Sequence, residues 1–224
     1  MFITNTDKTE LIWFGLRQIL EQVSGSDRAL QLDSGIIKPF DVVRDLGVPL
    51  YTELSLKQHI TRIASNCFYH LRQLRQIRRV VGEYVTSQLI SAFVLSRLDY
   101  CNSLLAGLPR TSVEPLQRVQ NAAGRLVRNL GLRDHVKPAL KQQHWLPVEH
   151  RIKYKLCTMM HQIYTGHAPQ YLAHSVQSVA EFNRRPGLRS ADTADYIKRR
   201  TPTKFGTLLQ SRWSSCLEFL TFLP

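Results

Sequence analysis

The sequence lacks most of the short motifs that mark an enzyme. Its 224 residues contain no Asp-Asp dipeptide, no glycine-rich phosphate-binding loop and no G-x-S-x-G turn. The missing aspartate pair is informative because a two-metal polymerase site needs carboxylates that converge on the ions from facing elements. Asp41 and Asp45 are four residues apart on an extended segment, a spacing that does not bring them together. We therefore expect no catalytic residue and no cofactor in this chain.

Cysteine is scarce and is not paired along the sequence. The four residues are Cys67, Cys101, Cys157 and Cys216. They form no C-x-x-C motif, so the sequence predicts neither a zinc knuckle nor a disulfide framework. Cys157 and His161 are one helical turn apart and could share a metal ion, but their apolar neighbours favour a position in or beside the core. We expect no metal site, and reduced thiols in an intracellular compartment, with nucleus and cytoplasm not distinguished.

Long hydrophobic runs are also absent. The longest, Leu11–Leu16 and Leu89–Leu95, are far shorter than the roughly 20 residues that a membrane span needs. Charged residues between Asp7 and Glu10 interrupt the region in which a signal peptide would need an apolar segment. We therefore expect a soluble chain that does not associate with membranes.

Acidic side chains are few, and their distribution divides the chain. Lysine and arginine number 30 against 17 aspartate and glutamate, a formal net charge of +13. Residues 1–53 carry a balance of −3, whereas residues 54–130 and 131–224 carry +8 each. A basic body favours a phosphate-rich partner, because each phosphate that a protein neutralises releases counterions. A solvated basic surface explains the same charge, and composition alone does not separate the two interpretations.

Short strands are expected within residues 1–53. Leu11–Phe14 is apolar and rich in aromatic and β-branched residues, a composition that favours a strand. Ala29–Leu32 and Ile36-Ile37 flank an Asp-Ser-Gly turn in the manner of a hairpin, and Asp41–Leu50 offers one further strand. Strands this short leave a face uncovered, so we interpret this region as a small, incomplete antiparallel β remnant.

Amphipathic helices dominate from residue 54 onward. Apolar residues recur at three- and four-residue steps, which places them on one helix face. The predicted helices cover residues 55–81, 83–105, 111–130 and 148–165. Gly82 separates the first two, and Thr111 with Glu114 forms a capping box for the third. The sequence thus predicts a mainly α fold, in which the β remnant precedes a basic domain of about four helices over residues 54–170 and a loop-rich, partly disordered tail over 171–224.

Arginines gather on the polar sides of two of these helices. Arg72, Arg75 and Arg79 share one face over two turns, and Glu83 is the only acidic residue within residues 54–98. Such a row of one sign can follow a nucleic-acid backbone without reading its sequence. A solvated helix face is the alternative. The candidate nucleic-acid-binding residues are Arg72, Arg75, Arg79, Arg118, Arg125 and Arg128.

A series of motifs in fixed order is similar to one protein family. The motifs are Asp7–Glu10, Trp13–Gly15, Asp41–Val48, His59-Ile60, Ser96–Pro109, Leu116–Ala123 and His144–Pro147. Together they resemble the C-terminal part of reverse transcriptases from non-LTR retrotransposons of the LINE, jockey and chicken-repeat type, over residues 4–206. The resemblance implies that Asp7–Glu10 is a palm motif, that Val42–Leu50 is the strand pair that grips the primer end, and that the helices form a thumb-like bundle.

In this family the catalytic aspartates precede the part that the motifs match. The resemblance therefore implies a truncated, catalytically inactive relic of an RNA-directed DNA polymerase, with at most weak, sequence-independent binding of RNA, DNA or an RNA–DNA hybrid. Two alternatives stay open. One is a domesticated helical protein-interaction module without nucleic-acid function, which would dock through residues 29–50. The other is a polymerase subunit that another chain completes.

Overall fold

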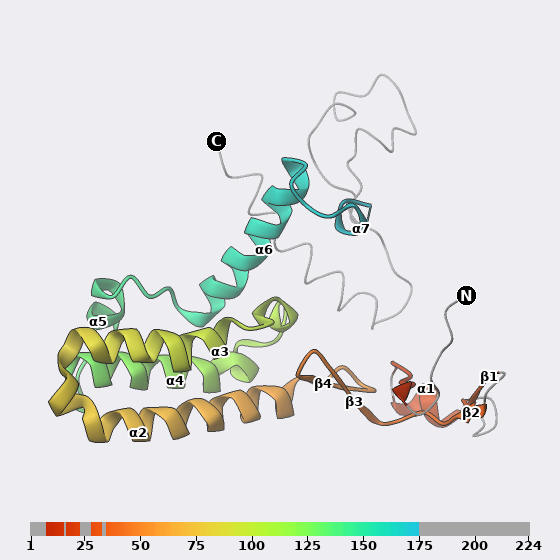
Figure 1. Cartoon of the computed structure of the whole chain (residues 1–224), viewed down its shortest axis with the longest axis horizontal. Helices are drawn as coiled ribbons and strands as arrows, with labels where there is room; N and C mark the ends of the chain where they lie inside the picture. The colour runs from red at the N-terminus through yellow and green to blue at the C-terminus, as the bar shows by residue number, and fades with distance from the viewer. Residues whose placement is uncertain (1–7, 16, 23–27, 33–34, 175–224) are drawn as a thin grey trace. The chain divides into compact units, whose positions relative to one another are not determined.

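The computed structural model describes residues 8–15, 17–22, 28–32 and 35–174. The chain forms two compact units, Met1–Arg62 and Ile63–Pro224, and Figure 1 labels their elements. The fold is mainly helical, with two small antiparallel sheets that precede a packed helical bundle in the chain, as the sequence predicts. The tail expected over residues 171–224 lies outside the described residues from residue 175 onward.

The first unit holds a short helix and two β-hairpins. Its elements are α1 (Arg17–Gln22), β1 (Leu30–Leu32), β2 (Gly35–Ile37), β3 (Val42–Asp45) and β4 (Val48–Tyr51). β1 pairs with β2, and β3 pairs with β4, both antiparallel and in separate sheets. The hairpin predicted across the Asp-Ser-Gly turn is therefore confirmed.

Two of the strand predictions for this unit are wrong. The single strand predicted over Asp41–Leu50 is a hairpin, because Leu46 and Gly47 both take positive φ values, 44° and 84°, and reverse the chain. A strand pair at this place is what the family resemblance implies. The strand predicted at Leu11–Phe14 is reduced to one bridge between Leu11 and Pro39, since proline has no N–H to extend a ladder.

The second unit is built from helices. The part of α2 (Lys57–Ile90) from Ile63 onward belongs to this unit. A π-helical turn, η2 (Ser91–Leu95), and then α3 (Ser96–Asp99) follow α2 directly. The elements that follow are the 3-10 turn η3 (Asn102–Leu105), α4 (Arg110–Arg128), α5 (Lys137–Gln142), α6 (Val148–Tyr164) and α7 (Gln170–Ala173). α4 and α6 confirm the helices predicted over residues 111–130 and 148–165, whereas the sequence pattern does not predict α5 or α7.

Gly82 breaks α2 where the sequence predicts a break. Its φ of 75° and ψ of −179° are not helical, and glycine takes this conformation without the steric cost that other residues meet. The two arms on either side of Gly82 run back along each other (Figure 1). They touch where the Cys67 thiol approaches the Val94 carbonyl oxygen at 3.9 Å.

The run Ser96–Pro109 ends the second arm earlier than predicted. The helix expected to reach residue 105 ends at Asp99, because Tyr100 is extended and Cys101 takes a left-handed conformation. η3 then forms a separate turn. Gly107 has a φ of 74°, the left-handed conformation that is common for a glycine just after a helix end.

α4 begins without the capping box predicted at Thr111 and Glu114. Its first residue is Arg110, and Pro109 stands at the N-cap with no side-chain hydrogen bond. Glu114 instead forms an ion pair with Arg118 at 3.3 Å, one turn further along. Because the helix begins before Thr111, that hydroxyl lies inside the first turn and cannot act as the cap.

The core of the second unit lies where α4 packs against η2, α5 and α6. Its least exposed apolar side chains are Ile90, Val94, Leu98, Leu116, Val119, Ala123, Val127, Val148 and Met160. Along Ile90–Leu98 and in α4 they recur at three- and four-residue steps, as an amphipathic pattern requires, and in α6 the buried Ile152 and Leu156 complete the same spacing. Periodicity thus identifies the buried faces correctly.

A buried amide network joins α4 to the start of α6. Gln120 is fully buried, and its Nε2 donates to the Leu146 carbonyl oxygen at 2.7 Å. Gln117 accepts a hydrogen bond from the Val148 N–H at 2.9 Å and donates to the Gln120 Oε1 at 3.1 Å. It also donates to the Asn121 Oδ1 at 2.9 Å. Because buried amides are costly without partners, this network sets how α4 and the start of α6 pack together.

An ion pair connects the run Ser96–Pro109 to α6. The Arg151 guanidinium donates through Nε to the Asp99 Oδ1 at 2.7 Å and through Nη2 to the Oδ2. Two parallel bonds of this kind fix orientation as well as distance. Asn102, which is buried, donates to the same Oδ1 at 3.4 Å. The polar residues of this run therefore have a packing role.

Gly124 lies at a close approach between α4 and α5. A Cβ at this position would lie 2.9 Å from the Leu140 Cδ2 and 3.3 Å from the Val136 Cγ2. We expect Gly124→Ala to lower the free energy of unfolding by about 1–3 kcal/mol through overpacking. Urea denaturation followed by circular dichroism measures this. Gly131→Ala is the control, since Gly131 is exposed and its Cβ would meet only the side chain of Asp134. An unchanged midpoint for Gly124→Ala would contradict this packing.

Candidate nucleic-acid interface

Arg72, Arg75 and Arg79 lie on the exposed face of the first arm of α2. All three are exposed, while Leu71 and Leu74 on the adjacent face of the helix are buried. The helix rises about 10 Å between Arg72 and Arg79. Among the described residues, none forms an ion pair with these three guanidinium groups. We call these residues the arginine row.

Negative charge is nearly absent around the arginine row. Glu83 is the only acidic residue within residues 54–98, and its carboxylate already pairs with Arg128 at 2.5 Å. Solvated helix faces usually mix both signs at neighbouring positions, which stabilises the helix. A row of one sign creates a positive local field instead, and such a field attracts anions.

Two of the three candidate arginines of α4 form ion pairs within the protein, and the third is half-buried. Arg118 pairs with Glu114 at 3.3 Å, and Arg128 pairs with Glu83 at 2.5 Å. Arg125 is half-buried, and its Nε is buried without a hydrogen-bond partner in the described part of the chain. The structure thus divides the six candidates, which the sequence pattern treats alike, into an unpaired set on α2 and an engaged or half-buried set on α4.

Arg78 has a structural role that its charge does not reveal. Its guanidinium donates to the Leu126 carbonyl oxygen at 3.1 Å and to the Val127 carbonyl oxygen at 2.8 Å. Both carbonyls belong to the last turn of α4, where helical carbonyls have no partner of their own and a cation is favourable. This role could be predicted from the sequence, because Arg78 lies at helical spacing from Leu71 and Leu74 and so falls on the same buried stripe.

Exposed aromatic rings lie beside the arginine row, and the charge pattern does not mark them. Phe68 and Tyr69 precede Arg72 by four and three residues, so they are its neighbours on the helix surface. The Tyr69 ring meets His70 edge-on with 5.5 Å between centroids, and His70 stacks on Phe93 of η2 at 5.6 Å. We call Tyr69, His70 and Phe93 the aromatic ladder. It joins the first arm of α2 to η2.

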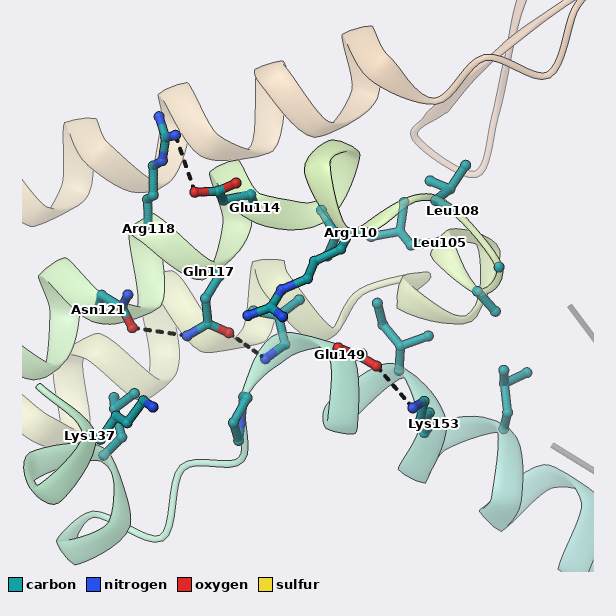
Figure 2. A pocket seen from close by; sticks show the side chains of 18 of the residues that line it. Leu105, Leu108, Arg110, Glu114, Gln117, Arg118, Asn121, Lys137, Glu149 and Lys153 are labelled. Atoms are coloured by element: carbon teal, nitrogen blue, oxygen red, sulfur yellow. Dashed lines mark hydrogen bonds and ion pairs between the residues drawn. The ribbon is translucent and has the colours of Figure 1, made fainter. Parts of the chain in front are cut away.

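A groove of about 950 Å³ lies among α4, α5 and α6 (Figure 2). Its apolar lining residues include Leu105, Leu108, Val113, Val136, Leu140, Val148, Ile152 and Leu156. Both carboxylates at its rim are paired, Glu114 with Arg118 and Glu149 with Lys153. The hydrogen bond from Lys153 lowers the pKa of Glu149, so this carboxylate stays ionised. Glu149 is therefore poorly suited to act as a general acid near neutral pH.

Cys67 and Cys157 are poorly suited to act as nucleophiles, and the described residues form no metal cluster. Burial raises the pKa of Cys67 to about 11 and raises that of Cys157 as well. Both side chains are therefore thiols at neutral pH, whereas the thiolate is the nucleophile. In the described ranges, no three or more histidine, cysteine, aspartate or glutamate side chains are grouped so that they could hold a metal ion. None of the helices described there is both long and apolar enough to cross a membrane.

Comparison with protein families, with characterised proteins and with solved structures gives no match to this chain. The similarity to non-LTR reverse transcriptases therefore rests on the sequence motifs alone. Two of these motifs contact each other in the folded chain, and a third contacts α6. Ser96–Pro109 reaches α6 through Asp99, and Leu116–Ala123 reaches His144–Pro147 through Gln120.

Two adjacent arginines allow the structural and the unpaired roles to be separated. Arg78→Gln removes the cation that bonds two carbonyl groups of α4, so we expect the free energy of unfolding to fall by about 1–3 kcal/mol. Arg79→Gln alters an exposed, unpaired side chain and should change stability by less than about 0.5 kcal/mol. Urea denaturation of both variants measures the difference. Equal stability of the two would refute the role assigned to Arg78.

Proposed function

We propose that this chain corresponds to the C-terminal part of a non-LTR retrotransposon reverse transcriptase, has no catalytic activity of its own and retains weak, sequence-independent binding to nucleic acid. The observation that supports binding most is the arginine row, whose three side chains are exposed and have no ion-pair partner among the described residues. The ordered motifs, from Asp7–Glu10 to His144–Pro147, support the origin.

The arginine row suits a phosphate backbone in both geometry and charge. Its guanidinium groups are planar forks that bind phosphate oxygens in pairs, and they are spread over about 10 Å of helix. Contacts to phosphate position a nucleic acid without carrying sequence information. Counterion release drives such binding, so the affinity falls steeply as salt is added.

We propose no polymerase activity for this chain by itself. Nucleotidyl transfer needs metal ions held between converging carboxylates. The sequence has no Asp-Asp dipeptide, and Asp41, just before β3, and Asp45, its last residue, are both exposed. We therefore do not expect this chain by itself to extend a primer, even when it binds nucleic acid.

One observation favours a second candidate function, protein interaction through the first unit. Large apolar side chains between residues 30 and 46 are exposed to solvent. They are Leu30, Ile36, Phe40, Val42 and Leu46. Short sheets with open edges and exposed apolar side chains are docking surfaces for other chains. In this alternative the chain is a helical interaction module, and substitutions in the arginine row do not change its binding to a protein partner.

The arginine row is tested by the combined change Arg72→Gln, Arg75→Gln and Arg79→Gln. We expect the affinity for a labelled RNA–DNA hybrid to fall by about tenfold or more at low salt, because three phosphate contacts are lost. The slope of log K against log salt should become shallower by about 2 to 3 for the same reason. Fluorescence anisotropy at several salt concentrations measures both quantities.

The control is a variant with the same charge change elsewhere on the second unit. Lys137→Gln, Lys141→Gln and Lys155→Gln also remove three positive charges, all from exposed positions on α5 and α6. This control should lose far less affinity than the arginine variant. If the two variants bind equally well, the binding depends on net charge alone and the arginine row is not the interface.

A further inference from the structure

One end of the aromatic ladder, Tyr69, lies beside the arginine row on the helix surface. Tyr69 lies one helical turn before Arg72, and side chains at this spacing touch the same patch of helix surface. Tyr69 is 53% exposed and Phe93 is 42% exposed, so both ends of the ladder are open to solvent. This surface can therefore make ionic contacts through the arginines and stacking contacts through an exposed ring.

Neighbouring groups hold the rings of the ladder in place. Tyr69 meets His70 edge-on, and His70 stacks on Phe93 with 18° between the ring planes. Arg97 donates to the Phe93 carbonyl oxygen at 2.7 Å and adds a cation beside the ladder. Burial, with a contribution from Arg97, lowers the pKa of His70, so this imidazole is neutral at pH 7. The ladder is therefore an ordered and uncharged surface.

We propose that this surface binds single-stranded nucleic acid, with phosphates along the arginine row and unpaired bases stacked on the exposed rings of the aromatic ladder. This inference rests on the proposed function and adds the state of the strand to it. It requires no sequence preference, because every base has a face that can stack on an aromatic ring.

Access to the bases favours a single strand over a duplex. Within a duplex both faces of a base are covered by its neighbours in the stack, so a protein ring reaches them only if a base is flipped out. In a single strand those faces are open, and basic surfaces with aromatic side chains are the usual means of binding them. Because Tyr69 and Arg72 are surface neighbours, a strand that follows the arginine row brings its next base beside the Tyr69 ring.

The experiment removes one ring and compares the two strand states. The full-length chain is titrated by fluorescence anisotropy at low salt with a labelled oligo-dT and with a labelled duplex of equal length. We expect oligo-dT to bind more tightly than the duplex. Tyr69→Ala should weaken oligo-dT binding about fivefold or more, the loss of roughly one stacked base, and leave duplex binding unchanged. Tyr69→Phe keeps the ring and should keep the affinity.

Two further variants control the comparison. Tyr154→Ala removes a tyrosine that is 67% exposed on α6, away from the ladder, and should bind as the unaltered chain does. Phe93→Ala removes the other exposed end of the ladder and should reproduce the loss seen with Tyr69→Ala. Retained duplex binding and an unchanged circular dichroism spectrum show that each variant is folded.

The outcomes distinguish this inference from the proposed function. A loss confined to oligo-dT, restored by Tyr69→Phe, supports both. If the ring variants bind oligo-dT as tightly as the unaltered chain, or if the duplex binds as tightly as oligo-dT, the inference about single strands is overturned while the arginine row stands. If neither nucleic acid binds, both are overturned.

Discussion

The reversal of α2 at Gly82 is the constraint on which the candidate interface depends. A helix of 34 residues that continued unbent would have no second arm to pack against. With a φ of 75°, Gly82 turns the chain back so that Cys67 meets Val94 and His70 stacks on Phe93. One stripe of the first arm is buried as a result. The arginine row lies beside that stripe and faces solvent.

Two contacts fasten this reversal to α4. On one side of Gly82, the guanidinium of Arg78 bonds the last carbonyls of α4, and on the other side Glu83 pairs with Arg128. The second contact has an electrostatic consequence. It engages the only acidic residue within residues 54–98, and so it leaves no free carboxylate of that segment to neutralise the arginine row. The ion pair between Glu83 and Arg128 thus both helps to pack the two arms of α2 against α4 and preserves the positive field of the arginine row.

Helical periodicity predicted much of this fold, because buried faces repeat along one element. The stripes of α4 and α6 and the exposure of Arg72 follow from that repeat, and the break at Gly82 follows from the glycine itself. The hairpin turn at Leu46 was missed, since a leucine with positive φ is outside the usual turn signals. α5 was missed because six residues are too few to show a period.

Helical periodicity does not predict contacts between residues that are far apart in the sequence. His70 and Phe93 stack only because the chain reverses between them, and Glu83 finds Arg128 across 45 residues. The sequence shows the sign of each charge but not its partner, so it grouped Arg118 with Arg72. Spatial partners decide which charges remain for a ligand. Because some of these charges are paired within the protein, the net charge of +13 overstates the positive charge that is available to a ligand.

The number of unpaired arginines bounds the affinity. Proteins that bind DNA tightly through its backbone make about 6 to 10 phosphate contacts, whereas the arginine row offers three side chains. To recruit Arg118 or Arg128 as well, the ligand would have to break an existing ion pair, which offsets part of the gain. Electrostatics alone therefore supports weak binding. An added contribution has to come from contacts of another kind, and the exposed rings beside Arg72 are the groups on this surface able to make them.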